Sequence, residues 1–316
     1  MPILSIRHVT RYRYRTPVGL GEHRMMLRPR ESYDQRILSC DLTITPTPER
    51  MRSVHDVFGN CVSIAGFTGR TKELTFDSRV RLDHTPLPAF ADVEGEVEVY
   101  TGAMPFDYSP EDLPDLEQSM QRHYPDPEGL IDAWARRFVK PMGKTSLQTL
   151  LSDMTQAIYA EFKYNSRLAR GIQDPLETLA LHSGTCRDYA ILMIEAARSL
   201  GLAARFVSGY IYSPMVGAGL SRASAGHTHA WVRVYLPACG WVEFDPTNGI
   251  VGNADLVRVA IARDPRQAVP LHGSWSGAAA DYLGMEVEVD VRDEGELDVQ
   301  PMTPRTIGAG GSTSKV

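Results

Sequence analysis

A chain of 316 residues with 43% hydrophobic and 23% charged residues has the composition of an ordinary globular protein, and its length suggests about two domains. The formal net charge of −6, with no run of lysines or arginines, argues against a nucleic-acid-binding protein. No segment is long and apolar enough to span a membrane, and the first residues, MPILSIRHVTRYRYR, lack the apolar core of a signal peptide, so we expect a cytoplasmic protein.

Residues 1 to about 100 are expected to form β-structure. Short alternating segments rich in β-branched residues, such as CVSIAGF at 61–67 and KELTFDSRVRL at 72–82, are separated by Pro and Gly turn signals. Several short strands at this spacing are typical of a sandwich or barrel, so we predict an antiparallel β-sandwich or barrel-like domain over residues 1–105. The arginines gathered between Arg7 and Arg30 fit solvated strand faces and ion pairs better than a substrate-binding patch.

A change of composition after residue 85 indicates a linker. Prolines and acidic residues dominate residues 85–127, which we expect to form a connection with one short helix. Residues 127–139 and 146–164 each place apolar residues on one side at helical spacing, so two amphipathic helices are predicted there. Residues 165–179 are expected to form a loop before the next helix.

The stretch that organises the chain is SGTCRDYAILMIEAARSLG, residues 183–201, which predicts one amphipathic helix. Thr185 can cap its start with Asp188 in the first turn, and Gly201 supplies a left-handed stop. Cys186 then lies where unpaired backbone N–H groups and the helix dipole favour an anion. Such a position can lower the pKa of a cysteine from about 8.5 to roughly 3.5–7.5. The alternative for an isolated cysteine is a small hydrophobe that seals a core helix.

Four strand-like segments follow this helix, at residues 204–212, 229–236, 240–247 and 285–293. A Gly/Ser-rich loop at residues 215–226 separates the first two, and loops of this kind often border a cleft and gate access to it. Residues 296–316 are expected to form a disordered tail.

A hairpin with an odd loop would bring His229 and Asp245 onto one face of the sheet. His229 opens its strand, Asp245 closes the next one, and LPACG connects them. A loop of three or five residues pairs Leu236 with Gly240, which makes Asp245 the diagonal cross-strand neighbour of His229. Diagonal neighbours lie about 7–8 Å apart, within reach of a carboxylate–imidazole hydrogen bond. An even loop would turn Asp245 to the opposite face.

A cysteine, a histidine and an aspartate are the residue types that nucleophilic catalysis by a thiol requires. A cysteine thiolate attacks a carbonyl carbon, a histidine forms an ion pair with it and later protonates the leaving group, and a carboxylate fixes the histidine tautomer. The N–H groups at the start of the cysteine helix can stabilise an oxyanion. Each residue alone is weak evidence. A cysteine at a helix start followed by a histidine and an aspartate at the ends of adjacent strands is much more specific.

The segments GTCRDYA, GYIY, HAWVRV and GWVEFDPT, in this order, resemble the bacterial transglutaminase-like domain of the papain-like cysteine-protease superfamily. The segments YRYRTPV, LRPR and DVFGNCV resemble the β-domain that precedes this core in one bacterial subfamily. The resemblance implies a triad of Cys186, His229 and Asp245. It also implies an α+β fold, in which residues 106–295 form a catalytic core with the cysteine helix packed on an antiparallel sheet. The implied activity is thiol-dependent acyl transfer or amide hydrolysis without a cofactor.

The residues around this triad are assigned less specifically. Tyr164 matches the aromatic position upstream of the cysteine and is expected to line the site or donate to the oxyanion, with plain packing as the alternative. Trp231 is expected to pack beside the imidazole, and His227 to line the cleft. Asp188 fits a helix cap better than a chemical role. For Asn248, closing the end of the hairpin and binding substrate both stay open.

Metal chemistry and disulfides are not expected. Cys40, Cys61 and Cys239 form no C-x-x-C pairs, so they fit reduced structural thiols better than a zinc site or a disulfide framework. The leading prediction is a thiol hydrolase or acyltransferase that acts on a peptide, protein or isopeptide amide. The alternative is a binding module with the same fold and a disused site, against which the intact triad argues.

Overall fold

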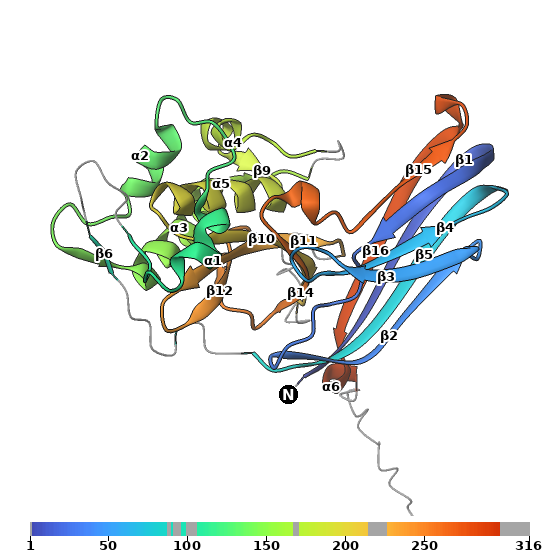
Figure 1. Cartoon of the computed structure of the whole chain (residues 1–316), viewed down its shortest axis with the longest axis horizontal. Helices are drawn as coiled ribbons and strands as arrows, with labels where there is room; N and C mark the ends of the chain where they lie inside the picture. The colour runs from blue at the N-terminus through green and yellow to red at the C-terminus, as the bar shows by residue number, and fades with distance from the viewer. Residues whose placement is uncertain are drawn as a thin grey trace, which may run out of the picture.

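A computed structural model describes residues 2–86, 90, 96–98, 106–166, 171–213 and 226–297. Two antiparallel sheets lie next to each other, and helices cover the sheet that carries the predicted catalytic strands (Figure 1). The predicted α+β class is therefore confirmed. The expected gating loop at 215–226 and the expected tail at 296–316 fall outside the described residues, apart from residues 226, 296 and 297. No described helix is long and apolar enough to cross a membrane.

The first sheet is one curled antiparallel layer built around a single long strand. Its members are β1 (Ile3–Met25), β2 (Gln35–Thr45), β3 (Arg50–His55), β4 (Cys61–Gly66), β5 (Arg70–His84), β15 (Leu271–Ser276) and β16 (Tyr282–Asp293). The order is β2-β5-β1-β4-β3, and β15 and β16 also pair with β1. Alternate residues near the start of β1, such as Leu4 and Ile6, are buried because successive side chains point to opposite faces of a sheet.

The pairing of β15 and β16 bears on the predicted division of the chain. The predicted domains, residues 1–105 and 106–295 with a tail at 296–316, stay a prediction. Within the segment 106–295, however, β15 and β16 do not extend the core sheet: β16 lies antiparallel to β1 from Leu4 opposite Asp293 to Tyr14 opposite Tyr282. The first sheet therefore contains strands from both ends of the described chain (Figure 1).

The second sheet carries the predicted catalytic strands. Its order is β13-β12-β11-β10-β14, all antiparallel, with β10 (Ala204–Ile211), β11 (His229–Leu236), β12 (Gly240–Asp245), β13 (Ile250–Val251) and β14 (Leu256–Ala262). β10, β11 and β12 match three predicted strands. β14, with the sequence LVRVAIA, was not anticipated. All seven of its residues are buried, so it lacks the alternation that marked the other strands.

The described helices all follow β5 in the chain, and most of them precede β15. They are α1 (Leu113–Met120), α2 (Leu130–Arg136), α3 (Leu147–Glu161), α4 (Pro175–Leu181) and α5 (Cys186–Ser199), with a short α6 (Glu294–Leu297) and two 3-10 turns, η1 (Pro265–Gln267) and η2 (Ala279–Asp281). Two small pairs add β6 (Glu96–Glu98) with β7 (Lys144–Ser146), and β8 (Lys163–Tyr164) with β9 (Ser183–Gly184).

Helix α4 corrects the expectation of a loop over residues 165–179. Asp174 caps it by accepting a hydrogen bond from the backbone N–H of Leu176 at 2.9 Å, and Pro175 occupies the first turn. Proline is well suited there because the first N–H groups of a helix have no intrahelical acceptor. The Asp-Pro pair was thus a helix-start signal that the sequence interpretation passed over.

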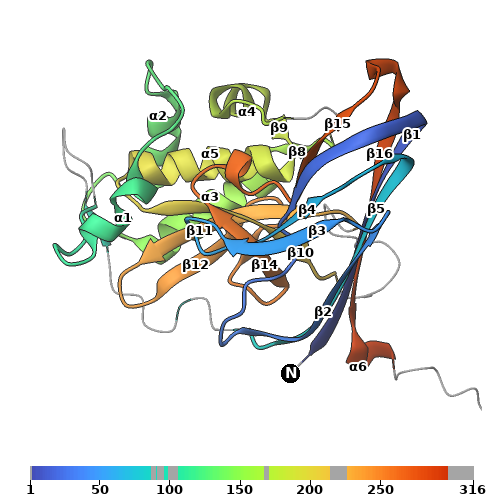
Figure 2. The ribbon, with the colours of Figure 1, turned by 45° about the vertical axis from the view of Figure 1, so that its right-hand side comes forward.

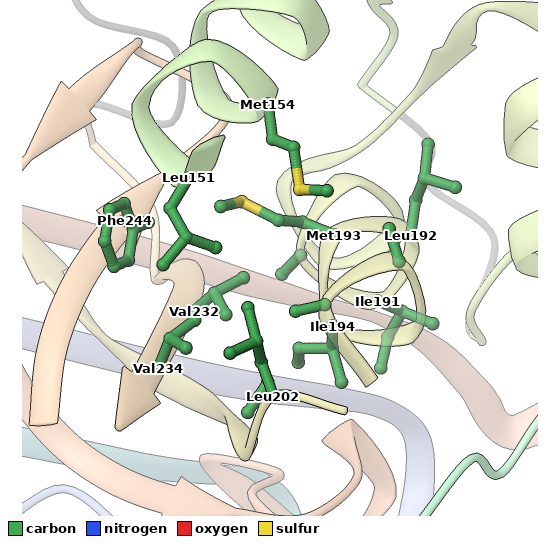
Figure 3. Close-up of a cluster of buried hydrophobic side chains, with 14 of the residues drawn as sticks. Leu151, Met154, Ile191, Leu192, Met193, Ile194, Leu202, Val232, Val234 and Phe244 are labelled. Carbon is green, nitrogen blue, oxygen red and sulfur yellow. The ribbon is translucent and has the colours of Figure 1, made fainter. Parts of the chain in front are cut away.

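Helix α5 is buried on all sides rather than on one face. Of residues Cys186–Arg198, only Arg187 is exposed. The helix lies between α2 and α4 on one side and β10 and β11 on the other (Figure 2). Its apolar side chains meet residues of α3, β11 and β12 in the main core (Figure 3), which includes Leu151, Met154, Ile191, Leu192, Met193, Ile194, Leu202, Val232, Val234 and Phe244. The buried Glu195 forms an ion pair with Arg198 at 2.9 Å, which satisfies both charges.

The two sheets share a core and a polar anchor. Residues of β1, β5 and β16 pack with residues of β10 and β14 in one buried cluster: Leu4, Ile6, Val80, Leu82, Tyr210, Tyr212, Val257, Val259 and Val289. Beside it, the buried Arg258 of β14 donates to Asp34 at 2.5 Å and to Glu243 of β12 at 3.0 Å. Asp34 precedes β2, so this anchor ties the first sheet to a strand of the core.

Candidate active site

The start of helix α5 places Cys186 at its first residue. The Asp188 carboxylate accepts hydrogen bonds from the backbone N–H of Thr185 at 2.8 Å and from its hydroxyl at 2.9 Å, so the predicted cap at Thr185 and Asp188 is confirmed. Asp188 also accepts from the backbone N–H of Gln173 at 2.7 Å. The Cys186 side chain is buried, with 7% of the residue exposed, and none of the four cysteines, all of them described, forms a disulfide.

The segment before Cys186 allows no side chain at residue 184. A Cβ atom on Gly184 would lie 2.9 Å from the Cβ of Asp188, so glycine lets this strand pass close to the capping residue. Strand β9 pairs in parallel with β8, with Tyr164 opposite Gly184. Tyr164 is half-buried and meets Tyr189 edge-on, with ring centroids 6.5 Å apart. This pairing brings Tyr164 near the start of α5.

The β11–β12 hairpin has the register that the sequence predicted. Leu236 pairs with Gly240 across a three-residue loop, and the pairing runs on to Val232 opposite Phe244. Ala238 and Gly240 both have positive φ, of 64° and 70°, as expected for residues that reverse the chain in a short hairpin. The odd loop therefore leaves Asp245 on the His229 side of the sheet.

His229 and Asp245 are hydrogen-bonded in the interior of the protein. His229 Nε2 donates to Asp245 Oδ2 at 2.8 Å, and both side chains are fully buried. His229 Nδ1 is also buried and forms no hydrogen bond with another nitrogen or oxygen atom of the described residues, whereas the Cys186 side chain forms a hydrogen bond with His229 that raises the pKa of the ring. The side chain of Cys186 lies close enough to His229 to influence its protonation. The three residues predicted to form the triad are thus brought together, with His229 between the other two.

The electrostatics of this arrangement favour a charged imidazole. Burial alone would lower the pKa of His229, but the charge and hydrogen bond of Asp245, with a contribution from Cys186, raise the pKa of His229 to about 10. Burial would likewise raise the pKa of Asp245, yet the charge and hydrogen bond of His229, together with hydrogen bonds from Asn248 and the Thr247 backbone, lower it. The site therefore holds an imidazolium against a carboxylate.

Trp231 packs beside the imidazole, where the sequence placed it. Its ring is fully buried and stacks on His229, with centroids 5.8 Å apart and 28° between the planes. Gly209 of the GYIY segment lies opposite His229 in the neighbouring strand. A Cβ atom on Gly209 would be 2.7 Å from the Trp231 ring and 2.0 Å from the carbonyl oxygen of Val257. A glycine is required there for the tryptophan to reach the histidine.

His227 and Asn248 lie near the triad residues in the sequence and differ in what the structure shows of them. His227 is exposed, and its expected place along a cleft stays a prediction. Asn248 does not close the hairpin passively: its Nδ2 donates to Asp245 Oδ2 at 2.8 Å and lies 3.4 Å from His229 Nε2. Its position three residues after Asp245 was the available signal, because a turn after the strand can return a side chain to the last strand residue.

Metal ligands are not gathered in the part of the chain that the structure describes: no group of three or more His, Cys, Asp or Glu side chains there is arranged to hold a metal ion.

Comparison with known proteins identifies the family. Residues 4–83 match the family model of the bacterial transglutaminase-like N-terminal region, and residues 133–246 match that of the transglutaminase-like superfamily. The uncharacterized protein Rv2569c of Mycobacterium tuberculosis is 30% identical over 299 residues, which make up 90% of this chain and 91% of that protein. The chain belongs to the transglutaminase-like superfamily. The resemblance inferred from the sequence motifs is thereby confirmed.

Two further comparisons show how far the likeness extends. The uncharacterized protein YebA of Bacillus subtilis is 37% identical over 76 residues, which are 22% of this chain and 10% of that protein. A solved structure, described as a "putative cysteine protease" from Cytophaga hutchinsonii, covers 92% of this chain and 91% of its own, with a TM-score of 0.66 and 20% identity. That protein therefore shares the fold of this chain over most of its length.

Proposed function

We propose that this transglutaminase-like protein is a thiol-dependent acyl-transfer enzyme that hydrolyses an amide bond in a peptide, protein or isopeptide. The observation that carries the proposal is His229, held by Asp245 through Nε2 at 2.8 Å and linked to the Cys186 side chain by a hydrogen bond that helps to raise its pKa. A nucleophile, a base and an orienting acid in this order form the arrangement that activates a thiol.

The reaction would begin with attack on the substrate carbonyl. The Cys186 thiolate forms a C–S bond, and the carbonyl oxygen becomes an oxyanion. The N–H groups in the first turn of α5 have no intrahelical acceptor and can donate to that oxygen. The His229 imidazolium then gives its proton to the amide nitrogen as the C–N bond breaks. The amine leaves, and the acyl group stays on Cys186 as a thioester.

The second half of the reaction would release the acyl group. Neutral His229 takes a proton from a water molecule, whose oxygen attacks the thioester carbonyl. The C–S bond breaks, the carboxylic acid leaves, and the sulfur returns as a thiolate beside the imidazolium. An amine in place of water would give transamidation by the same steps. We favour water because it is always present and no amine site is evident among the described residues.

Selective alkylation tests whether Cys186 is activated. We expect iodoacetamide to label Cys186 faster than Cys40, Cys61 or Cys239, as mapped by mass spectrometry. His229→Ala should slow the labelling of Cys186 by about 100-fold, in the range of general acid–base effects. His272→Ala, which removes an exposed histidine of β15, is the matched control and should leave the rate unchanged. Equal, slow labelling of all four cysteines would refute the proposal and favour a binding module.

Covalent capture would identify the substrate class. The protein is incubated with a peptide library, quenched with acid and mass-mapped for acyl adducts on Cys186, with Cys186→Ala as the control. Adducts confined to Cys186 support a thioester intermediate. Activated labelling of Cys186 without any peptide adduct would reject peptides as substrates while leaving the thiol chemistry in place.

A further inference from the structure

A cavity that contains no triad residue opens on the first sheet. Its volume is about 300 Å³, enough for a small ion with some of its water. Its charged and polar lining comes from Arg28, Arg30 and Glu31, which lie between β1 and β2, and from His55 and Cys61, at the adjoining ends of β3 and β4. None of the reactions considered above uses these residues.

Arg30 is fixed in this cavity by neutral acceptors. Its Nη1 donates to the backbone carbonyl of Phe58 at 2.8 Å and to the side-chain oxygen of Asn60 at 2.9 Å. Nε and Nη2 have no hydrogen-bond partner among the described residues, and no described carboxylate forms an ion pair with this guanidinium. Burial lowers the pKa of Arg30, and the charge of Asp56 only partly opposes this effect. The Arg30 guanidinium is therefore held in place through Nη1, and its Nε and Nη2 groups can donate to a ligand.

The nearby Asp56 is occupied with building the loop rather than neutralising Arg30. Its carboxylate accepts from the backbone N–H groups of Phe58 at 2.9 Å and Asn60 at 2.8 Å, and from the Asn60 side chain at 2.9 Å. The loop turns at Gly59, whose φ is 73° and whose Cβ, if present, would lie 3.7 Å from both terminal nitrogens of Arg30. Glycine thus places no side chain of residue 59 against the guanidinium.

Arg28 supplies a second cation with a loose counter-ion. Its guanidinium lies 3.9 Å from the Glu31 carboxylate, and the two side chains are 45% and 53% exposed. The Arg28 guanidinium also lies beside the Cys40 thiol: burial raises the pKa of Cys40, and the charge and hydrogen bond of Arg28 oppose that increase. The cavity lining therefore contains two guanidinium groups against one carboxylate at the limit of ion-pair distance.

We propose that this cavity binds a small oxyanion of the carboxylate or phosphate class between Arg28 and Arg30. Guanidinium groups present pairs of N–H donors that match two oxygens of such an anion, and a pre-positioned fork loses little freedom on binding. The surplus positive charge, the spare donors of Arg30 and the absence of a side chain at residue 59 all favour an anion over a neutral or cationic ligand.

The site lies at the joint between the two sheets. The backbone N–H of Arg30 donates to the carbonyl of Arg258 in β14 at 3.0 Å. The Asn60 side chain forms two hydrogen bonds with Ile261 of β14. Its Oδ1 accepts from the Ile261 N–H at 2.9 Å, and its Nδ2 donates to the Ile261 carbonyl at 2.7 Å. An anion bound to Arg30 would therefore contact a residue that already connects the two sheets.

Cys61 provides a test that requires no knowledge of the enzyme's substrate. Iodoacetate is an anion and iodoacetamide is its neutral counterpart, so their rate ratio at Cys61 reports the local preference for an anion. We expect this ratio to exceed the ratio at the half-buried Cys239 by about fivefold at low salt, because the guanidinium groups attract the carboxylate. Mass mapping separates the two sites and also Cys40.

Substitution distinguishes the cavity from general surface charge. Arg28→Gln should abolish the excess ratio at Cys61. Arg52→Gln is the matched control. Arg52 is an exposed arginine of β3 that forms a long ion pair with Glu22, at 3.7 Å, and does not line the cavity. Both variants change exposed side chains and are expected to fold. Equal loss in both variants would overturn the proposal.

Competing ions identify the chemistry of the anion. If inorganic phosphate binds with a Kd of about 1 mM, then about 10 mM phosphate slows iodoacetate labelling of Cys61 roughly tenfold relative to chloride at matched ionic strength. Acetate is tested in parallel. Stronger protection by phosphate assigns the site to phosphate-like anions, and stronger protection by acetate assigns it to carboxylates. The absence of protection by either ion, together with equal rate ratios at Cys61 and Cys239, would refute the site.

Discussion

Asn248 shares one carboxylate oxygen with the predicted catalytic histidine. Asp245 Oδ2 accepts from Asn248 Nδ2 at 2.8 Å and from His229 Nε2 at 2.8 Å, while Oδ1 accepts from the Thr247 backbone at 3.0 Å. These donors hold the carboxylate in one orientation and favour its charged form. Asn248 is therefore a positioning residue, which acts on the imidazole through Asp245.

Replacing Asn248 by alanine should make the buried carboxylate less stable. The loss of one hydrogen bond to a charged group is expected to lower the free energy of unfolding by about 1.5–3 kcal/mol. The pKa of Asp245 is lowered in the folded state, so its contribution to stability is present above pH 3.8 and is lost as the pH falls through the folded pKa. In Asn248→Ala this loss should begin at a higher pH, as measured by urea unfolding at several pH values. Gln118→Ala, which removes an exposed contact with Arg263 at 3.3 Å, should leave the curve unchanged.

The protonation of His229 is a second prediction at this scale. Because the pKa of His229 is raised from 6.5 to about 10, its stabilising contribution is fully present below pH 6.5 and is lost as the pH rises toward 10. Asp245→Asn removes the charge that raises this pKa, so burial should then keep the ring neutral at pH 7. NMR titration of the His229 ring in both proteins measures the difference. A wild-type ring that titrates near 6.5 would contradict this picture.

At the scale of residues, the sequence was informative where chemistry is tied to a local pattern. Cys186 follows a capping residue, His229 begins one strand and Asp245 is the last residue of the next. The residue types and the odd number of residues in the connecting loop were therefore enough to place His229 and Asp245 together. Asn248 was left open because its contact depends on the path of the chain after Asp245. For Tyr164 and His227 the sequence supplies a place near the site, and a role in catalysis stays a prediction.

At the scale of elements, Gly209 lets strand β10 lie close to the side chain of Trp231 and the backbone of Val257. Gly209 lies where β10 and β14 shift register, and the side chain of Trp231 and the backbone of Val257 occupy the space where its Cβ would lie. Close approach of neighbouring groups is a common reason for glycine inside a strand. Trp231 can stack on His229 only while this space stays empty.

Gly209→Ala should therefore disturb both the sheet and the imidazole. We expect a loss of about 1–3 kcal/mol in the free energy of unfolding from overpacking, together with slower alkylation of Cys186 as Trp231 is displaced. The matched control is Gly66→Ala in β4, where an added Cβ would meet only the Cβ of Arg50, at 3.9 Å. That variant should be nearly neutral. Similar losses in both variants would show that strand propensity, rather than the contact with Trp231, is responsible.

Sequence patterns predicted the elements unevenly. The hairpin of β11 and β12 was predicted to the register because its polar and apolar faces alternate and its loop is short. Helix α5 was predicted at its cap and its stop, yet its full burial was not, since Glu195 and Arg198 suggest a polar face that the structure hides by pairing them. β14 was missed because a strand buried on both faces shows no alternation.

At the scale of the whole molecule, the two sheets are fastened by charges as well as by packing. Arg258 joins Asp34, which directly precedes β2 of the first sheet, to Glu243 of the core, and all three side chains are almost fully buried. Breaking a buried ion pair by removing one partner leaves an uncompensated charge and costs about 3–5 kcal/mol. The shared apolar cluster between the sheets implies that such a loss is felt by both of them.

Asp34→Ala should accordingly lower the stability of the entire chain. We expect one cooperative transition, shifted by about 3–5 kcal/mol, rather than separate unfolding of the first sheet. Tryptophan fluorescence, circular dichroism and calorimetry should give coincident curves. Asp290→Ala, which breaks the exposed pair with Arg292, is the control and should cost at most about 1 kcal/mol. Two separate transitions would show that the sheets fold independently.

The return of β15 and β16 to the first sheet was not predicted. The segment at 285–293 was correctly expected to be a strand, but its partner lies near the other end of the chain, and pairing at that separation leaves no local signal. Order along the chain alone places residues 106–295 in one core. The family model of the N-terminal region stops at residue 83 and does not include these strands.

This closing strand has a consequence for synthesis on the ribosome. β1 is made first and β16 among the last described elements, so one edge of β1 waits without its partner while the core emerges. Translation at about 5–20 residues per second makes this wait long compared with the folding of a small domain. Nascent chains arrested before residue 282 would present an unpaired strand edge, a known starting point for aggregation, and would depend on chaperones until the last hairpin arrives.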